Sequence, residues 1–131
     1  LEFTDTTMTE WEFIGRMAEA ADCGIMLDLN NVFVSSFNHG FDPADYIDAM
    51  PHDRVVYYHL AGHTNRGTHI IDTHSDHVID PGWELLRRSW SHTGGRRGTL
   101  EWDENIPPFD VVWQEVVKAR DRVADLTAAG A

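Results

Sequence analysis

The sequence predicts an α/β fold, in which a parallel β-sheet is packed against helices. Segments with helical and strand character alternate along the chain in the order helix, strand, helix, strand, helix, strand, helix. The strand segments are mostly apolar throughout, which is typical of parallel strands buried on both faces. No repeat, low-complexity tract or linker interrupts this order. We therefore treat residues 1–131 as a single α/β unit.

The first half of the chain predicts two helices separated by a long strand. The first helix begins at Thr9 and ends before Gly24, and it has a helically spaced apolar stripe of Phe13, Ile14, Met17, Ala18 and Ala21. Residues 24–34 (GIMLDLNNVFV) predict a strand covered on both faces. Asp42 and Pro43 then start a second helix, which runs to about residue 50.

The second half of the chain predicts two further strands and two further helices. Residues 54–60 (RVVYYHL) predict a strand, and residues 67–79 are extended and loop-like. A helix follows from Pro81 to about residue 91, before a glycine-rich stop. Residues 99–103 (TLEWD) predict a short strand. The last helix spans about residues 109–126, with Val112, Val116, Val117 and Val123 on its buried side.

Charge and cysteine content exclude several classes of protein. The formal net charge of -12, from 22 acidic and 10 basic residues, disfavours nucleic acids and anionic membrane surfaces as partners. The single cysteine, Cys23, excludes an internal disulfide and zinc sites built from paired cysteines, and we expect it to be a buried thiol. No apolar run approaches the roughly 20 residues of a membrane span. We expect a cytoplasmic protein.

Polar residues occur where each predicted strand ends. Asp28, Asn30 and Asn31 lie in the first strand segment, His59 and His63 at the end of the second, and Glu101 and Asp103 at the third, while the loop-like segment contributes Asp72 and His74. Strand ends in α/β barrels meet at one rim, so these side chains are candidates for one site. Imidazole mixed with carboxylate suits iron, manganese or zinc, and ligand type alone does not select among them.

Simpler interpretations exist for some of these residues. Asn30 and Asn31 have side chains that commonly form turns or helix caps. His63 could bind a metal or hydrogen-bond to a residue that does. The spacing between His59 and His63 is that of a zinc protease motif, but that motif requires a helix and a Glu where Leu60 stands. We reject the zinc protease interpretation.

Four motifs in order carry a family resemblance: CGIMLDLNNVFVSSFNHGFDP, HLAGH, IDTH and LEWDENIPP. Together they resemble the multinuclear non-heme iron-dependent oxidative enzyme family (methanobactin-biosynthesis oxidase-like), from about Met8 to Ala119. The resemblance implies a xylose-isomerase-like (β/α)8 TIM barrel, of which this chain would supply the last three βα units, with five strands missing. A closed barrel typically takes about 250 residues, which agrees with a partial domain at residues 1–131.

The resemblance also implies a metal site with two or three iron ions, although zinc or manganese stays possible. The ligands it implies are Asp28, Asn31, His59, Asp72, His74 and Glu101. Asn30, His63 and Asp103 would hydrogen-bond to those ligands. Histidines on early strands and a further glutamate, which complete the family's site, have no counterpart here. We therefore expect an incomplete site and an inactive chain.

The resemblance implies that the full-length protein uses dioxygen to oxidise cysteine residues of a precursor peptide. It also implies that a partner protein presents this peptide. One alternative is a divalent-metal sugar isomerase or epimerase, as in similar barrels. Another is a non-catalytic fragment that self-associates or completes its barrel with a partner, because unpaired sheet edges pair with other chains. We expect a homo-oligomer or a partner-completed barrel.

Overall fold

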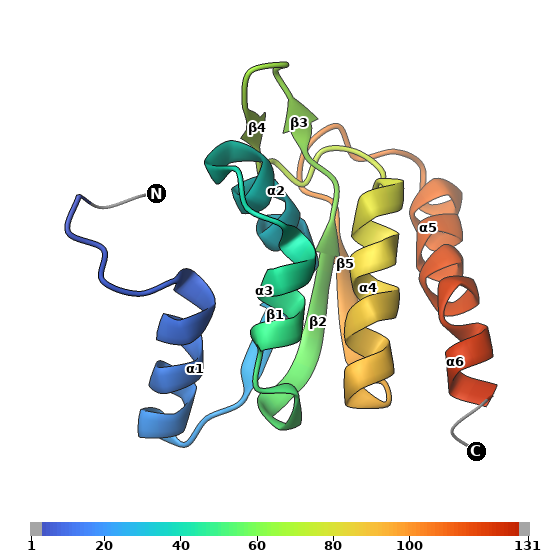
Figure 1. Cartoon of the computed structure of the whole chain (residues 1–131). Coiled ribbons are helices and arrows are strands. Elements are labelled where there is room, and N and C mark those ends of the chain that lie inside the picture. The colour runs from blue at the N-terminus through green and yellow to red at the C-terminus, as the bar shows by residue number, and fades with distance from the viewer. Residues whose placement is uncertain (1–3, 129–131) are drawn as a thin grey trace.

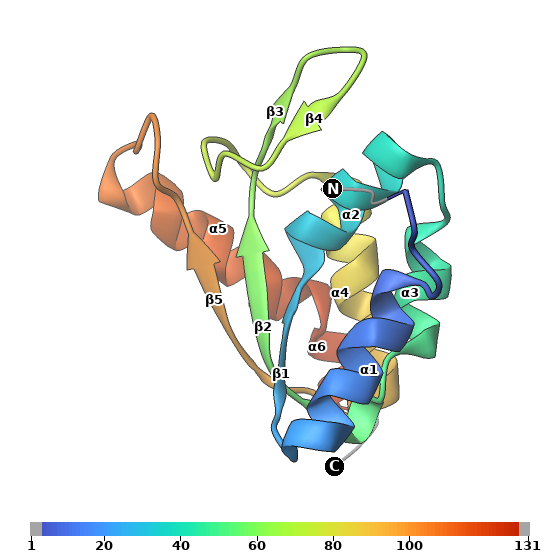
Figure 2. The ribbon, with the colours of Figure 1, turned by 90° about the vertical axis from the view of Figure 1, so that its left-hand side faces the viewer.

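The computed structural model describes residues 4–128 and has an α/β architecture with a parallel sheet. Its main sheet contains β1 (Ile25–Asp28), β2 (Val55–Ala61) and β5 (Arg97–Glu101), ordered β1-β2-β5 with both pairs parallel (Figure 2). The predicted α/β class and the parallel sheet are confirmed. A small antiparallel hairpin projects above the sheet in Figure 1. It consists of β3 (Thr64–Asn65) and β4 (Ile70–Ile71).

Helices make up most of the rest of the described chain. They are α1 (Glu10–Ala21), α2 (Leu29–His39), α3 (Pro43–Ala49), α4 (Asp80–Thr93), α5 (Phe109–Arg122), α6 (Ala124–Ala128) and a 3-10 turn, η1 (His52–Arg54). None of the helices within residues 4–128 is long and apolar enough to cross a membrane.

Local capping explains two helix starts that the sequence predicts. Thr9 and Glu12 form a reciprocal capping box at α1: the Glu12 N–H donates to Thr9 Oγ1 (3.3 Å) and the Thr9 N–H to Glu12 Oε2 (2.8 Å). Asp42 caps α3 by accepting from the Ala44 N–H (2.8 Å), with Pro43 at the first helical position. Both helices are confirmed because their signals are local in the sequence.

In the described chain one face of the sheet is open at the amino ends of β1 and β2, and helices cover the other face. Leu27 and Tyr58 project from it into the core, where they join residues of α2, α3 and α4, including Ile47 and Trp83. On the uncovered face Met26 is 57% exposed, and Val56 is similarly open. The prediction of strands buried on both faces is therefore wrong for this chain.

The predicted strand at residues 24–34 is also wrong in its second half. Strand β1 ends at Asp28, whose carboxylate accepts a hydrogen bond from the Asn31 N–H (2.9 Å) and so caps α2. Leu29 and Val32 are three residues apart and are buried on the same helix. A continuous apolar run fits a strand or a buried helix, and here the Asp28 cap selects the helix.

Three smaller predictions also need correction. Strand β5 begins and ends two residues earlier than predicted, so Asp103 lies beyond it. The last helix is two helices, and Arg87 from α4 holds their junction through the Arg122 carbonyl and both oxygens of Asp125. Cys23 is exposed rather than buried, because it lies in the turn between α1 and β1.

The predicted buried side of the last helix is only partly correct. Val123 is buried and Val112 and Val117 are half-buried, but Val116 is 39% exposed. The reason is an apolar groove of about 800 Å³ between β5 and α5, which Val116 lines without being covered. The buried residue of α5 is instead Glu115.

Candidate metal centre

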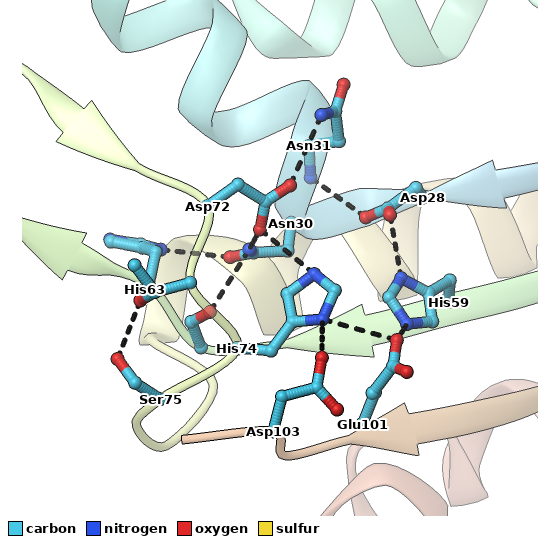
Figure 3. Close-up of polar contacts among 12 residues, drawn as sticks. Asp28, Asn30, Asn31, His59, His63, Asp72, His74, Ser75, Glu101 and Asp103 are labelled. Atoms are coloured by element: carbon cyan, nitrogen blue, oxygen red, sulfur yellow. Dashed lines mark hydrogen bonds and ion pairs between the residues drawn. The ribbon is translucent and has the colours of Figure 1, made fainter. Parts of the chain in front are cut away.

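The carboxyl ends of the three parallel strands bring Asp28, His59 and Glu101 together. In the sheet register Asp28 is opposite His59, and Ala61 is opposite Glu101. The buried imidazole of His59 donates through Nδ1 to Asp28 Oδ2 (2.7 Å) and through Nε2 to Glu101 Oε2 (2.6 Å) (Figure 3). One histidine thus joins carboxylates from both neighbouring strands.

Electrostatics at His59 favour its charged form. Burial opposes protonation, but the carboxylates of Asp28 and Glu101 outweigh it, so the pKa of His59 lies above its ordinary value. The same carboxylates would attract a cation in place of the proton.

The irregular segment after β4 supplies Asp72 and His74 to this cluster. His74 Nε2 lies 3.2 Å from Asp72 Oδ1, and its Nδ1 lies 3.2 Å from Glu101 Oε2 and 3.1 Å from Asp103 Oδ2. The rings of His59 and His74 have centroids 5.1 Å apart. His74 has a φ of 50°, which a non-glycine residue adopts only where its surroundings hold it. Its carbonyl accepts the Asp103 N–H (2.8 Å), so the two loops support each other.

Asn30, Asn31 and His63 hold Asp72 from the other side. The buried Asn30 amide donates to Asp72 Oδ1 and to the Gly62 carbonyl (3.2 Å), and its oxygen accepts from His63 Nδ1 (2.9 Å). Asn31 Nδ2 donates to Asp72 Oδ2 (3.2 Å). Burial lowers the pKa of His63, although Asp72 opposes this shift, which agrees with a neutral ring that donates through Nδ1. A role in a turn or helix cap therefore does not account for the hydrogen bonds that the Asn30 side chain makes.

Within residues 4–128, two groups of side chains have ligand atoms close enough to share a metal ion. Asp28, His59 and His74 form one group, and His74, Glu101 and Asp103 form the other, with all ligand atoms of a group within 4.8 Å of one another. His74 belongs to both. The donor set of imidazole and carboxylate fits a transition metal.

All nine predicted site residues therefore lie at this edge of the sheet, but in different positions. Asp28, His59, His74 and Glu101 lie in the two groups, as does Asp103, for which only a supporting role is predicted. Asp72 and Asn31 lie outside these two groups and are joined to each other by a hydrogen bond. Asn30 hydrogen-bonds to Asp72, and His63 hydrogen-bonds to Asn30.

Sequence reasoning missed three residues that shape the site: Asn38, Gly62 and Glu115. Asn38 hydrogen-bonds the backbone of Ile70 in β4, Gly62 lies against the backbone of Asp76, and Glu115 binds the segment after His74. Only Glu115 had a sequence signal, since its position three after Val112 and four before Ala119 puts a carboxylate within an apolar stripe.

Residues 1–124 match the family model described as RiPP precursor modification enzyme MbnB/TglH/ChrH. The chain belongs to this family. RiPPs are ribosomally synthesised peptides that are modified after translation, so members of the family act on a peptide precursor. The family predicted from the four sequence motifs is confirmed.

Curated relatives carry the name UPF0276 protein. The one from Anaeromyxobacter sp. (strain Fw109-5) is 42% identical over 127 residues, covering 97% of this chain and 45% of the relative. That of Acaryochloris marina is 42% identical over 120 residues, covering 91% and 43%, and that of Nitrosospira multiformis is 47% identical over 111 residues, covering 84% and 39%. The chain thus spans less than half the length of these relatives.

Proposed function

We propose that this chain carries part of the metal centre of an oxidative enzyme that modifies cysteine residues of a precursor peptide. The observation that carries the proposal is the pair of ligand groups sharing His74 at the carboxyl edge of a parallel sheet, in a member of a peptide-modifying family. Two groups that share one imidazole suit two neighbouring ions. Iron is the metal we propose, with zinc or manganese as the alternatives.

Asp28, His59, His74, Glu101 and Asp103 would hold the metal, and Asp72 and Asn31 would complete the set from the adjacent loop and helix. Bound iron would supply redox chemistry with dioxygen and lower the pKa of a cysteine thiol of the peptide. The chain's own contribution is orientation: Asn30 and His63 fix Asp72, and the backbone of residue 103 fixes His74.

We further propose that the sheet is part of a xylose-isomerase-like (β/α)8 barrel, of which the chain forms about the last three βα units. The uncovered sheet face with Met26 and Val56, and the outer strands β1 and β5, support this, because barrel strands pair on both edges and enclose one face. The barrel would be completed by further chain in a longer form or by a partner. The same incompleteness predicts that residues 1–131 alone are inactive.

Metal content tests the proposal directly. Elemental analysis of this chain and of a form extended to the length of its relatives, both purified without chelator, should find near-stoichiometric iron in the longer form. After anaerobic loading with Fe(II), the longer form mixed with a cysteine-containing precursor peptide should consume dioxygen once oxygenated buffer is added. Zinc or magnesium in both forms, or turnover of a sugar without oxygen uptake, would favour the isomerase alternative. Absence of metal from both forms would favour the non-catalytic alternative.

A further inference from the structure

Glu115 is a charged side chain in the interior of the molecule. It is 1% exposed, although it lies on the amphipathic helix α5. Its carboxylate accepts three hydrogen bonds, from the Val78 N–H (3.0 Å), from His77 Nδ1 (2.8 Å) and from Lys118 Nζ (2.7 Å). A buried carboxylate is unfavourable unless its oxygens are paired in this way. Two of its three donors belong to the segment that carries His74.

This segment, residues 72–79, has no helix or strand of its own. Its path from β4 to α4 therefore depends on contacts from outside. Gly62 lies against the backbone of Asp76 and His77, and Glu115 binds His77 and Val78 near the end of the segment. His74 lies two residues before Asp76, where the contact with Gly62 begins, and has a positive φ, a conformation that the chain keeps only under constraint.

Glu115 also reaches the other half of the site. The ring of His77, held by the Glu115 carboxylate, lies edge-on to the indole of Trp102, with centroids 4.9 Å apart and planes at 79°. Trp102 stands between Glu101 and Asp103, which belong to the second ligand group. One carboxylate thus supports the loop with His74 and, through one ring, the end of β5.

We propose that Glu115 is a positioning residue of the metal centre, acting through His77 and Val78 to align His74 with Glu101 and Asp103. The inference rests on the proposed function, because it takes these three side chains as ligands. Glu115 itself lies outside both ligand groups. Its effect on the site is separable from its effect on overall stability, because the segment it binds has no helix or strand of its own.

The test compares two variants with a matched control. Glu115→Gln removes the negative charge at constant shape, and His77→Phe keeps a ring against Trp102 but loses the bond to Glu115. The control is Ser89→Ala, since Ser89 is also fully buried and its hydroxyl donates to Tyr58 Oη (3.1 Å), within the core. All three should lower the unfolding temperature.

Only the first two variants should alter the site. Cobalt(II) titration should show at least tenfold weaker binding and a changed ligand-field spectrum for Glu115→Gln and His77→Phe, with Ser89→Ala like the parent. In the metal-free chain, long-range ¹H–¹⁵N spectra should show shifted His74 ring signals in the same two variants. If one of these two variants fails to fold, the cobalt affinity and the His74 signals of the other variant test the proposal.

Two outcomes would overturn the inference: unchanged cobalt binding and His74 signals in both variants, or an equal loss in Ser89→Ala. Failure of both the parent and the form extended to the length of its relatives to bind cobalt would count against the proposed function instead. In that case the metal-free spectra still decide whether Glu115 sets the position of His74.

Discussion

At the end of β2, Gly62 leaves no room for a side chain. A Cβ at this position would lie 1.9 Å from the Asp76 carbonyl oxygen and 2.8 Å from that of His77. These are backbone atoms, which cannot move aside as the end of a flexible side chain can. The glycine therefore permits the close approach of the segment that carries His74.

We expect Gly62→Ala to displace that segment, lowering the unfolding temperature and abolishing cobalt(II) binding. Gly15→Ala is the control: Gly15 is inside α1, where a new Cβ would meet Pro51 Cδ at 3.8 Å, an ordinary contact. It should stabilise the chain by up to about 1 kcal/mol in urea unfolding. Cobalt binding retained by Gly62→Ala would contradict the role given to this contact.

Asp28 has two separable tasks, since one oxygen caps α2 and the other binds His59. Asp28→Asn keeps an oxygen that can cap the helix but loses the charged bond to His59, so its unfolding free energy should fall by about 1.5–3 kcal/mol. It removes a charged ligand, so metal affinity measured by titration calorimetry should fall at least tenfold. Equal affinity in Asp28→Asn and the parent would remove Asp28 from the ligand set.

At the scale of helices and strands, the Asn38 side chain on α2 is a hydrogen-bonding partner for the backbone of β4. Its Nδ2 donates to the Ile70 carbonyl (2.8 Å) and its Oδ1 accepts the Ile70 N–H (2.9 Å), the pair of bonds that a neighbouring strand would make. Strand β4 has only two residues, so these two hydrogen bonds contribute much of what holds it in place. Asp72 follows β4 directly.

Asn38→Ala should therefore loosen the hairpin more than the rest of the fold. The loss of two hydrogen bonds corresponds to about 1–2 kcal/mol, and faster amide hydrogen exchange should appear at residues 64–72. Asn38→Asp keeps the acceptor for the Ile70 N–H and should give an intermediate effect. Exchange that rises evenly over the whole chain would indicate a general loss of stability.

At the opposite end of the sheet, η1 and α4 meet through two stacked histidines. The rings of His52 and His92 have centroids 4.2 Å apart and planes within 7° of parallel, and His52 Nδ1 is buried without a hydrogen-bond partner in the described chain. Burial lowers the pKa of His52 and the nearby His92 adds to this, against Asp48 and Asp53. Arg88 and His92 both bind Asp48, which lowers the pKa of Asp48 to about 2.

This arrangement predicts a loss of stability in acid. Because the folded-state pKa of His52 lies below its ordinary 6.5, the folded chain binds fewer protons, and stability falls as the pH drops from 6.5 towards that lowered pKa. Above pH 6.5 this contribution is constant. His52→Phe, which keeps a flat ring against His92, should show a smaller fall in unfolding temperature between pH 7.5 and 5.5. His69→Gln, on the exposed hairpin, should behave like the parent.

For the molecule as a whole, the uncovered sheet face and the groove beside α5 leave apolar surface open. Met26 and Val56 are each more than half exposed on a sheet whose outer strands have a free edge in the described chain. Such surfaces favour association between chains.

We expect the purified chain to self-associate in sedimentation velocity. The double variant Met26→Gln, Val56→Thr should weaken association at least tenfold, since burying each side chain contributes roughly 1.5–3 kcal/mol. Phe109→Gln is the control, because Phe109 is 76% exposed but lies on α5. A parent chain that sediments as a monomer at all concentrations would contradict the expected oligomer.

The sequence by itself determined the alternation of elements, the helices that begin at Thr9 and Asp42, and the set of polar residues at the strand ends. These follow from signals within a few residues of each other, and parallel strands place their carboxyl ends at one edge whatever the detailed packing. Glu101 was placed at the site correctly even though the predicted bounds of β5 were wrong by two residues.

Only the tertiary structure decided that residues 29–39 form a helix, that one sheet face is bare, and that Asn38, Gly62 and Glu115 support the loop with His74. An apolar run satisfies the period of a buried helix as well as that of a strand, so its cap and its neighbours select between them. The supporting contacts join residues 14 to 38 positions apart. Packing brings such residues together, and no local pattern in the sequence encodes which of them will meet.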